Sequence, residues 1–173
     1  MDKPTLAALE HLYRRLQSWP ECWQWQPDPD WPSPCDRGDG HWQPVRQEPP
    51  GDFANVEQAL GETLHPSIKA FFGAYYAEHL TVHHERGQVT LLGVWNEEDF
   101  RRLQENLIGH VLMKRRLGQP LTLFFACTDD DDLLLSVDNL SGEVVLEPVG
   151  QEAREVVALS LAEFLDSLTG NPS

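Results

Sequence analysis

The chain has 173 residues, 40% of them hydrophobic, and its 28 acidic and 13 basic side chains give a formal net charge of −15. This length and apolar content exclude general disorder and indicate one domain over residues 1–173. The negative charge repels nucleic-acid phosphates and anionic lipid headgroups but attracts basic surfaces, so we expect a basic protein partner and no nucleic acid; an acidic surface that only confers solubility is the alternative.

No stretch approaches the roughly eighteen apolar residues that a membrane span needs, and charges interrupt the amino-terminal segment where a secretory signal needs an apolar run. We therefore expect a cytosolic protein that does not insert directly into lipid. Cys22, Cys35 and Cys127 are odd in number and form no CxxC pair. This pattern agrees with a reducing compartment and favours buried or half-buried thiols over a disulfide framework or a zinc ribbon.

The chain begins with a helix and a long loop. Apolar residues at helical spacing predict an amphipathic helix over residues 5–17 with Thr5 as its cap. Residues 19–50 contain eight of the 13 prolines and five of the six tryptophans, too much proline for a helix or central strand and too much aromatic surface for free solvent. We expect an ordered, packed loop. Its aromatic residues either hold it against the domain or line a peptide groove, for which Trp31 and Trp42 are our candidates.

A short helix is expected over residues 55–60, followed by a stronger one over residues 65–77 in which proline takes the first position. Its expected aromatic face comprises Ile68, Phe71, Phe72, Tyr75 and Tyr76. Apolar and polar residues then alternate over residues 80–83 and 89–92, on either side of a turn near Gly87, which predicts a β-hairpin.

The strongest helical signal starts at Asn96 and ends near Leu117. Asn96 can cap the helix and Asp99 takes the reciprocal capping-box position, while the basic residues 114–116 suit the negative carboxyl end of the helix dipole. Apolar residues at three- and four-residue spacing predict a stripe that faces the core: Phe100, Leu103, Leu107, Val111, Leu112 and Leu117.

Apolar strands are expected next over residues 121–128, 133–137 and 143–146. Ser160 and Glu163 form a capping box for a terminal helix that ends near Leu168. Because helices and strands fall in separate blocks, we expect the α+β class, with a mostly antiparallel or mixed sheet flanked by helices.

Candidate chemistry is sparse. His79 and His83 would share one face of a helix at the spacing of zinc ligands, but the alternation around them favours a hairpin, so we predict no metal. Asp129, Asp130, Asp131 and Asp132 lack the glycine and spaced ligands of a calcium loop, and we assign them to a solvated turn or to contact with a basic partner. Because no nucleophile, phosphate or dinucleotide motif is present, we predict neither a cofactor nor catalysis.

The run EEDFRRLQENLIGHVLMKRRLGQPLTLFFA resembles the Syd family, the SecY-interacting proteins of gram-negative bacteria. The similarity covers nearly the whole chain, since further segments read like that family in the expected order: 32–35, 42–44, 55–57, 65–77, 139–144 and 161–165. The resemblance implies the wider SUKH architecture and an acidic concave face that receives the partner.

The resemblance also implies a cytoplasmic protein that associates peripherally with the inner membrane by binding the cytoplasmic loops of SecY, and that senses or interferes with uncomplexed or faulty SecY. We expect it to be a monomer. Candidate partner-binding residues are Asp129 to Asp132, Glu97, Glu98, Glu105, Trp31 and Trp42. Two alternatives stay open: an immunity-type SUKH protein that masks a basic toxin, and a cryptic hydrolase.

Overall fold

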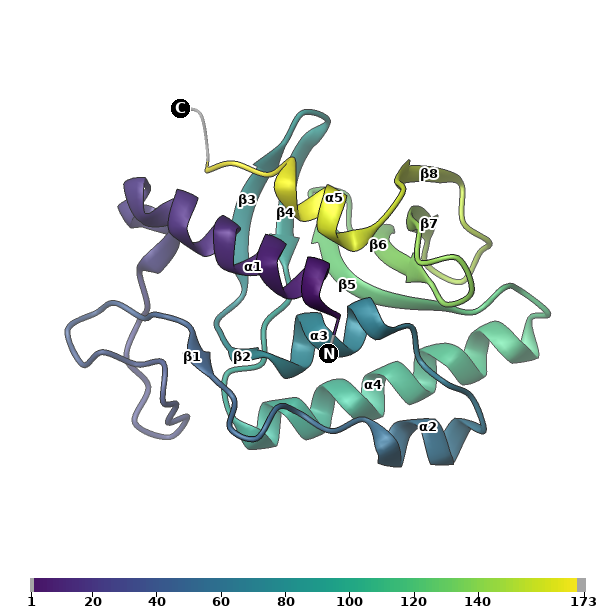
Figure 1. The fold of residues 1–173 in the computed structure, drawn as a ribbon, viewed down its shortest axis with the longest axis horizontal. Helices are drawn as coiled ribbons and strands as arrows, with labels where there is room; N and C mark the ends of the chain where they lie inside the picture. The colour runs from purple at the N-terminus through teal and green to yellow at the C-terminus, as the bar shows by residue number, and fades with distance from the viewer. Residues whose placement is uncertain (1, 171–173) are drawn as a thin grey trace.

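A computed structural model describes residues 2–170 and shows an α+β fold with a six-stranded antiparallel sheet, in the order β3-β4-β5-β6-β7-β8, and a two-stranded sheet β1-β2 (Figure 1). This confirms the predicted fold class. The helices are α1 (Lys3–Arg15), α2 (Ala54–Leu60), α3 (Pro66–Gly73), α4 (Glu97–Arg116) and α5 (Leu161–Asp166), with 3-10 turns at Leu16–Ser18 and Pro20–Trp23. The strands are β1 (Val45–Arg46), β2 (Tyr75–Tyr76), β3 (Leu80–His84), β4 (Gly87–Leu91), β5 (Thr122–Thr128), β6 (Leu133–Asp138), β7 (Val144–Pro148) and β8 (Glu155–Ala158).

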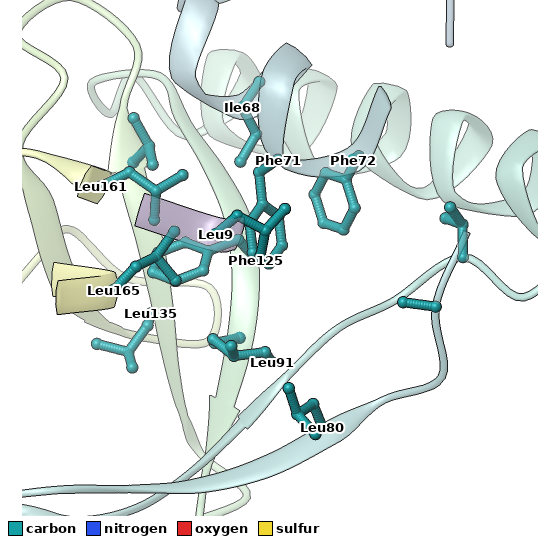
Figure 2. Packing of buried hydrophobic residues seen from close by; sticks show 14 of the residues in the cluster. Leu9, Ile68, Phe71, Phe72, Leu80, Leu91, Phe125, Leu135, Leu161 and Leu165 are labelled. Carbon is teal, nitrogen blue, oxygen red and sulfur yellow. The ribbon is translucent and has the colours of Figure 1, made fainter. Parts of the chain in front are cut away.

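Helices cover both faces of the large sheet. The ring of Phe125 on β5 packs against Phe71 of α3 and Phe164 of α5, whereas the preceding residue, Phe124, meets the ring of His110 on α4. Since successive strand residues point to opposite faces, α4 lies on one side of the sheet and α3 and α5 on the other. On the α3 and α5 side, side chains from helices and strands converge into the main core (Figure 2).

Several tryptophans of the tryptophan-rich loop pack against the domain. Trp23 donates a hydrogen bond to the Leu16 carbonyl at 2.9 Å, and the ring of Trp23 packs on that of Trp42. Trp42 in turn donates to the Cys22 carbonyl and contacts the ring of Trp95. With 2% of its surface exposed, Trp42 belongs to the core. Trp42, one of the candidate partner contacts, is therefore packed inside the domain and has no exposed ring face in this structure.

Two helix boundaries differ from the prediction. Helix α3 ends at Gly73 instead of continuing to residue 77. The Gln47 side chain donates hydrogen bonds to the Phe72 and Tyr75 carbonyls, and the Gly51 N–H donates to the Gly73 carbonyl. Because these carbonyls are bonded outside the helix, the helix does not continue. Tyr75 and the next residue then form strand β2 instead of extending the helix.

Helix α1 begins earlier than expected, at Lys3, and its cap position is Asp2. Thr5 is buried inside the first turn and donates to the Asp2 carboxylate at 2.6 Å. The prediction that Thr5 caps the helix is wrong, since its hydroxyl is a donor to the preceding residue and not an acceptor for the helix.

The predicted apolar stripe of α4 is correct as far as Val111. Leu107 and Val111 are buried, but Leu112 and Leu117 are 51% and 48% exposed. Lys114, one of the basic residues expected at the carboxyl end of the helix, is buried. The helical period explains the difference, since positions 107, 111 and 114 share one face, whereas residue 112 is turned about 100° away from residue 111.

The hairpin β3-β4, strands β5 to β7 and the capped helix α5 form as predicted, but strand β8 was missed. Its segment opens with charged residues, and the side chains of Glu155 and Val156 are exposed. Strand β8 pairs with β7 alone and lies at the edge of the sheet, where a clear apolar alternation is not required.

Asn96 is the cap of α4, as predicted, and its side chain accepts the Asp99 N–H at 2.9 Å. We expect Asn96→Ala to lower the free energy of unfolding in urea by about 1 kcal/mol, because an acceptor for a free helix N–H is lost. Asn96→Asp retains that acceptor and loses only the amide donor to the Pro32 carbonyl, so it should lose less. Asn106→Ala, at an exposed interior position of the same helix, is the matched control and should cause no loss, since alanine has the higher helix propensity. An equal loss in all three variants contradicts the capping role.

Candidate functional site

A groove runs along the amino-terminal half of α4. It consists of two hollows, of about 440 and 500 Å³, that share the side chains of Tyr76, Glu97 and Arg101 in their lining. One wall is the segment 47–52 and the other is the segment 30–34. We call this feature the α4 groove. Figure 1 shows the start of α4 passing below β1 and β2.

Carboxylates line the α4 groove from both walls and from its floor. They belong to Asp30, Glu48, Asp52, Glu97 and Glu98, all of them exposed. Among the lining residues that the structure describes, the one Lys or Arg is Arg101. Prolines and the side chains of Trp31, Tyr76 and Phe100 supply the apolar surface between these charges. An elongated, basic segment with apolar side chains would match this lining.

The wall formed by residues 30–34 is fixed to the start of α4 by hydrogen bonds. Trp95 donates from its ring to the Trp31 carbonyl at 3.0 Å, and the Asn96 amide donates to the Pro32 carbonyl at 2.8 Å. The guanidinium of Arg102 lies over the Trp31 ring, 4.9 Å from its centroid, in a cation–π contact. This wall is therefore held in place before any partner arrives.

The wall formed by residues 47–52 is fixed further along α4, at Phe100 and Gln104. The Gln104 amide donates to the Asp52 carbonyl at 2.8 Å. Gly51 lies so close to the Phe100 ring that a Cβ at this position would meet it at 2.7 Å. The backbone can approach the helix here because residue 51 has no side chain, and this approach positions the carboxylates of Glu48 and Asp52 over the groove.

The structure brings together some of the candidate residues and separates others. Trp31, Glu97 and Glu98 meet in the α4 groove. Glu105 is exposed on the same helix, one turn beyond Arg101 and outside the lining. The cluster Asp129 to Asp132 lies elsewhere, in the turn between β5 and β6.

Sequence reasoning missed the contributions of Asp30, Glu48, Asp52 and Tyr76. Glu48 and Asp52 flank the segment Pro49-Pro50-Gly51, a composition that predicts a rigid turn. That signal could have identified two acids on one loop, but nothing local to it indicates that the loop faces α4.

A second polar cluster is buried beneath the carboxyl-terminal half of α4. The Glu147 carboxylate on β7 lies 3.4 Å from the Lys114 ammonium, and it accepts hydrogen bonds from the hydroxyls of Thr122 at 2.9 Å and Ser136 at 3.1 Å. His110 Nε2 is 3.3 Å from the same carboxylate. These five side chains, the Glu147 cluster, join α4 to strands β5, β6 and β7.

The Glu147 carboxyl favours its charged form in spite of its burial. Burial raises the pKa of Glu147, but the His110 hydrogen bond, the Lys114 charge and the Thr122 hydrogen bond together outweigh it, so the pKa lies below its usual value. Lys114 also donates to the Gln151 carbonyl at 3.0 Å. Because each charge is satisfied and the side chains are buried, the geometry suits holding α4 on the sheet.

The two histidines considered as zinc ligands make different contacts. His83 lies in strand β3, as predicted, and its backbone exchanges hydrogen bonds with Thr169. The Nδ1 atom of His79 accepts the Gly93 N–H at 3.0 Å. Within residues 2–170, no three His, Cys, Asp or Glu side chains are grouped so that they could hold a metal ion.

Comparison with known proteins identifies the family. The family model described as Syd protein (SUKH-2) matches residues 4–170. The chain belongs to the Syd family. Among proteins named Protein Syd, that of Pseudoalteromonas atlantica is 46% identical over 149 residues, covering 82% of this chain and 80% of the relative. Those of Alteromonas mediterranea and Colwellia psychrerythraea are 49% and 44% identical; each alignment covers 82% of this chain, and 82% and 78% of the respective relatives.

The family match covers both the α4 groove and the Glu147 cluster, so neither lies in an addition outside the Syd-family region. Across the part of this Syd-family chain that the structure describes, no helix combines the length and the apolar character that crossing a membrane requires.

Proposed function

We propose that this Syd-family chain is a non-enzymatic regulatory protein that binds the basic cytoplasmic loops of the SecY translocon subunit in the α4 groove. The observation that supports this proposal most directly is the row of carboxylates on both walls of a preformed groove. Cytoplasmic loops of membrane proteins carry an excess of Lys and Arg. Attraction between the two charge patterns speeds encounter and sets the register of the bound loop.

The same charge pattern keeps the contact on protein. Anionic lipid headgroups on the cytoplasmic leaflet repel an acidic surface, so a chain with net charge −15 would be held at the inner membrane through SecY and not through lipid. As a monomer bound in this way it would sense, or interfere with, SecY that is uncomplexed or faulty. An immunity protein that masks a basic toxin is the second candidate, because the same groove would also accept a basic toxin segment.

Retention of SecY from detergent-solubilised inner membranes tests the proposal. Tagged protein should retain SecY at low salt and release it at high salt, because the Debye length falls from about 10 Å at 0.1 M to about 3 Å at 1 M. Extracts depleted of SecY are the control. If a basic toxin encoded beside this chain is retained instead, the immunity function replaces this one; if SecY is not retained at low salt, the proposal fails.

A further inference from the structure

A second hollow, unrelated to the α4 groove, opens at the tip of the large sheet. It encloses about 190 Å³ between the β3-β4 turn, the β5-β6 turn and helix α5, and it shares no lining residue with the α4 groove. We call it the tip pocket. Figure 1 shows α5 and the tip of the β3-β4 hairpin on the side of the molecule opposite to α4. Its apolar walls are Val89, Leu133, Leu135, Leu146, Val157 and Phe164.

The tip pocket is held open by specific contacts. Arg86, in the β3-β4 turn, makes two hydrogen bonds of 3.0 and 2.8 Å to the Glu155 carboxylate at the start of β8, across the open side of the curled sheet. The ring of His84 stacks on Phe164 with 5.2 Å between centroids, and its Nδ1 atom accepts the Arg86 N–H. The two ends of the sheet are thereby joined around the hollow.

The rim of the tip pocket is acidic. Asp129 and Asp130 line it, whereas the positive charge of Arg86 is already matched by Glu155. Burial lowers the pKa of His84, although nearby Glu85 opposes that shift, so His84 adds no charge at neutral pH. The rim therefore attracts a cation and repels an anion, while the interior takes an apolar group.

We propose that the tip pocket binds one large apolar side chain of a partner polypeptide, with a Lys or Arg next to it in the partner sequence paired to Asp129 and Asp130. The volume supports a single side chain, since an apolar cavity of about 150 Å³ accommodates benzene. The acidic rim selects a basic neighbour. This proposal does not rest on the SecY function, because the two sites share no lining residue.

The test is an NMR titration of the full chain with N-acetyl-phenylalanyl-arginine amide. Methyl resonances of the pocket residues Val89, Leu135 and Val157 should shift. Replacing phenylalanine by alanine in the probe should weaken binding about 10-fold or more, given the free energy of burying an aromatic side chain. Replacing arginine by glutamate should also weaken binding. Probes that bind equally well with arginine and glutamate overturn the proposal in favour of a site for small apolar molecules.

Variants of β8 give a matched pair. Val157→Phe places a ring in the pocket and should abolish the shifts, whereas Val156→Phe adds the same group at a neighbouring, exposed position outside the lining and should leave them unchanged. Asp129→Asn combined with Asp130→Asn should weaken binding and flatten its salt dependence. Unchanged binding in Val157→Phe, or no methyl shift with the phenylalanyl-arginine probe, overturns the proposal.

Discussion

Glu147→Gln is expected to lower the free energy of unfolding by about 3–5 kcal/mol, the usual consequence of leaving one partner of a buried ion pair uncompensated. The Lys114 and Glu147 side chains are each 1% exposed. The glutamine oxygen can still accept hydrogen bonds from the Thr122 and Ser136 hydroxyls. The loss of stability therefore reports mainly the unpaired charge on Lys114. Urea denaturation measures it.

Two controls separate this effect from simple loss of a carboxylate. Glu152→Gln removes an acid of the same type from an exposed position and should change stability by less than about 0.5 kcal/mol. Adding Lys114→Met to Glu147→Gln removes the unpaired charge and should recover part of the loss. The proposed pairing is contradicted if Glu147→Gln lowers the free energy of unfolding no more than Glu152→Gln does. It is also contradicted if the double variant loses as much as Glu147→Gln and Lys114→Met lose separately, added together.

The same carboxylate contributes to the acid limit of stability. Because the folded-state pKa of Glu147 lies below its unfolded value, its contribution is fully present above the unfolded pKa of about 4.3 and is lost as the pH falls through the folded value. The wild-type stability curve should therefore fall more steeply below about pH 4 than that of Glu147→Gln. Subtracting one stability curve from the other cancels the contribution of the other acidic residues, because both proteins contain them.

Local sequence signals predicted the elements that depend on local physics. Asn96 caps α4 because its side chain reaches the nearby Asp99 N–H, and the β3-β4 hairpin follows from alternation around a glycine turn. Helix α3 was predicted too long because Gln47, far from it in the chain, takes carbonyls at its end. Lys114 was assigned to the carboxyl end of α4 from local signals, but its burial depends on Glu147 on a distant strand, which has no local signature.

The candidate site divides in the same way. Glu97 and Glu98 could be identified since they stand at the start of the clearest helix in the sequence. Asp52 joins them through the contact of Gln104 with its carbonyl, a long-range contact without local signature. Trp31 and Trp42 look alike in the sequence, yet one lines the groove and the other is buried in the core, because proline-rich composition shows that a loop packs but not which ring faces inward.

Reversing one charge in the α4 groove is expected to weaken binding of a basic SecY loop peptide by at least about tenfold. Glu97 contributes to both hollows, so Glu97→Lys places a positive charge beside the Lys and Arg side chains of the bound peptide. Like charges brought together in an interface cost several kcal/mol. Loss of the helix-dipole interaction costs only about 0.3–1 kcal/mol, so the variant should stay folded. Surface plasmon resonance at two salt concentrations measures both the affinity and its salt dependence.

Glu105→Lys is the matched control, because it makes the same change in net charge on the same helix but outside the groove lining. It should slow association slightly, through weaker long-range steering, and leave dissociation unchanged. Arg101→Gln removes the basic side chain shared by the two hollows and should strengthen binding. Equal losses in Glu97→Lys and Glu105→Lys contradict binding in the groove and attribute it to net charge alone. Weaker binding in Glu97→Lys together with stronger binding in Arg101→Gln supports the groove, provided that Glu105→Lys does not weaken binding to the same extent as Glu97→Lys.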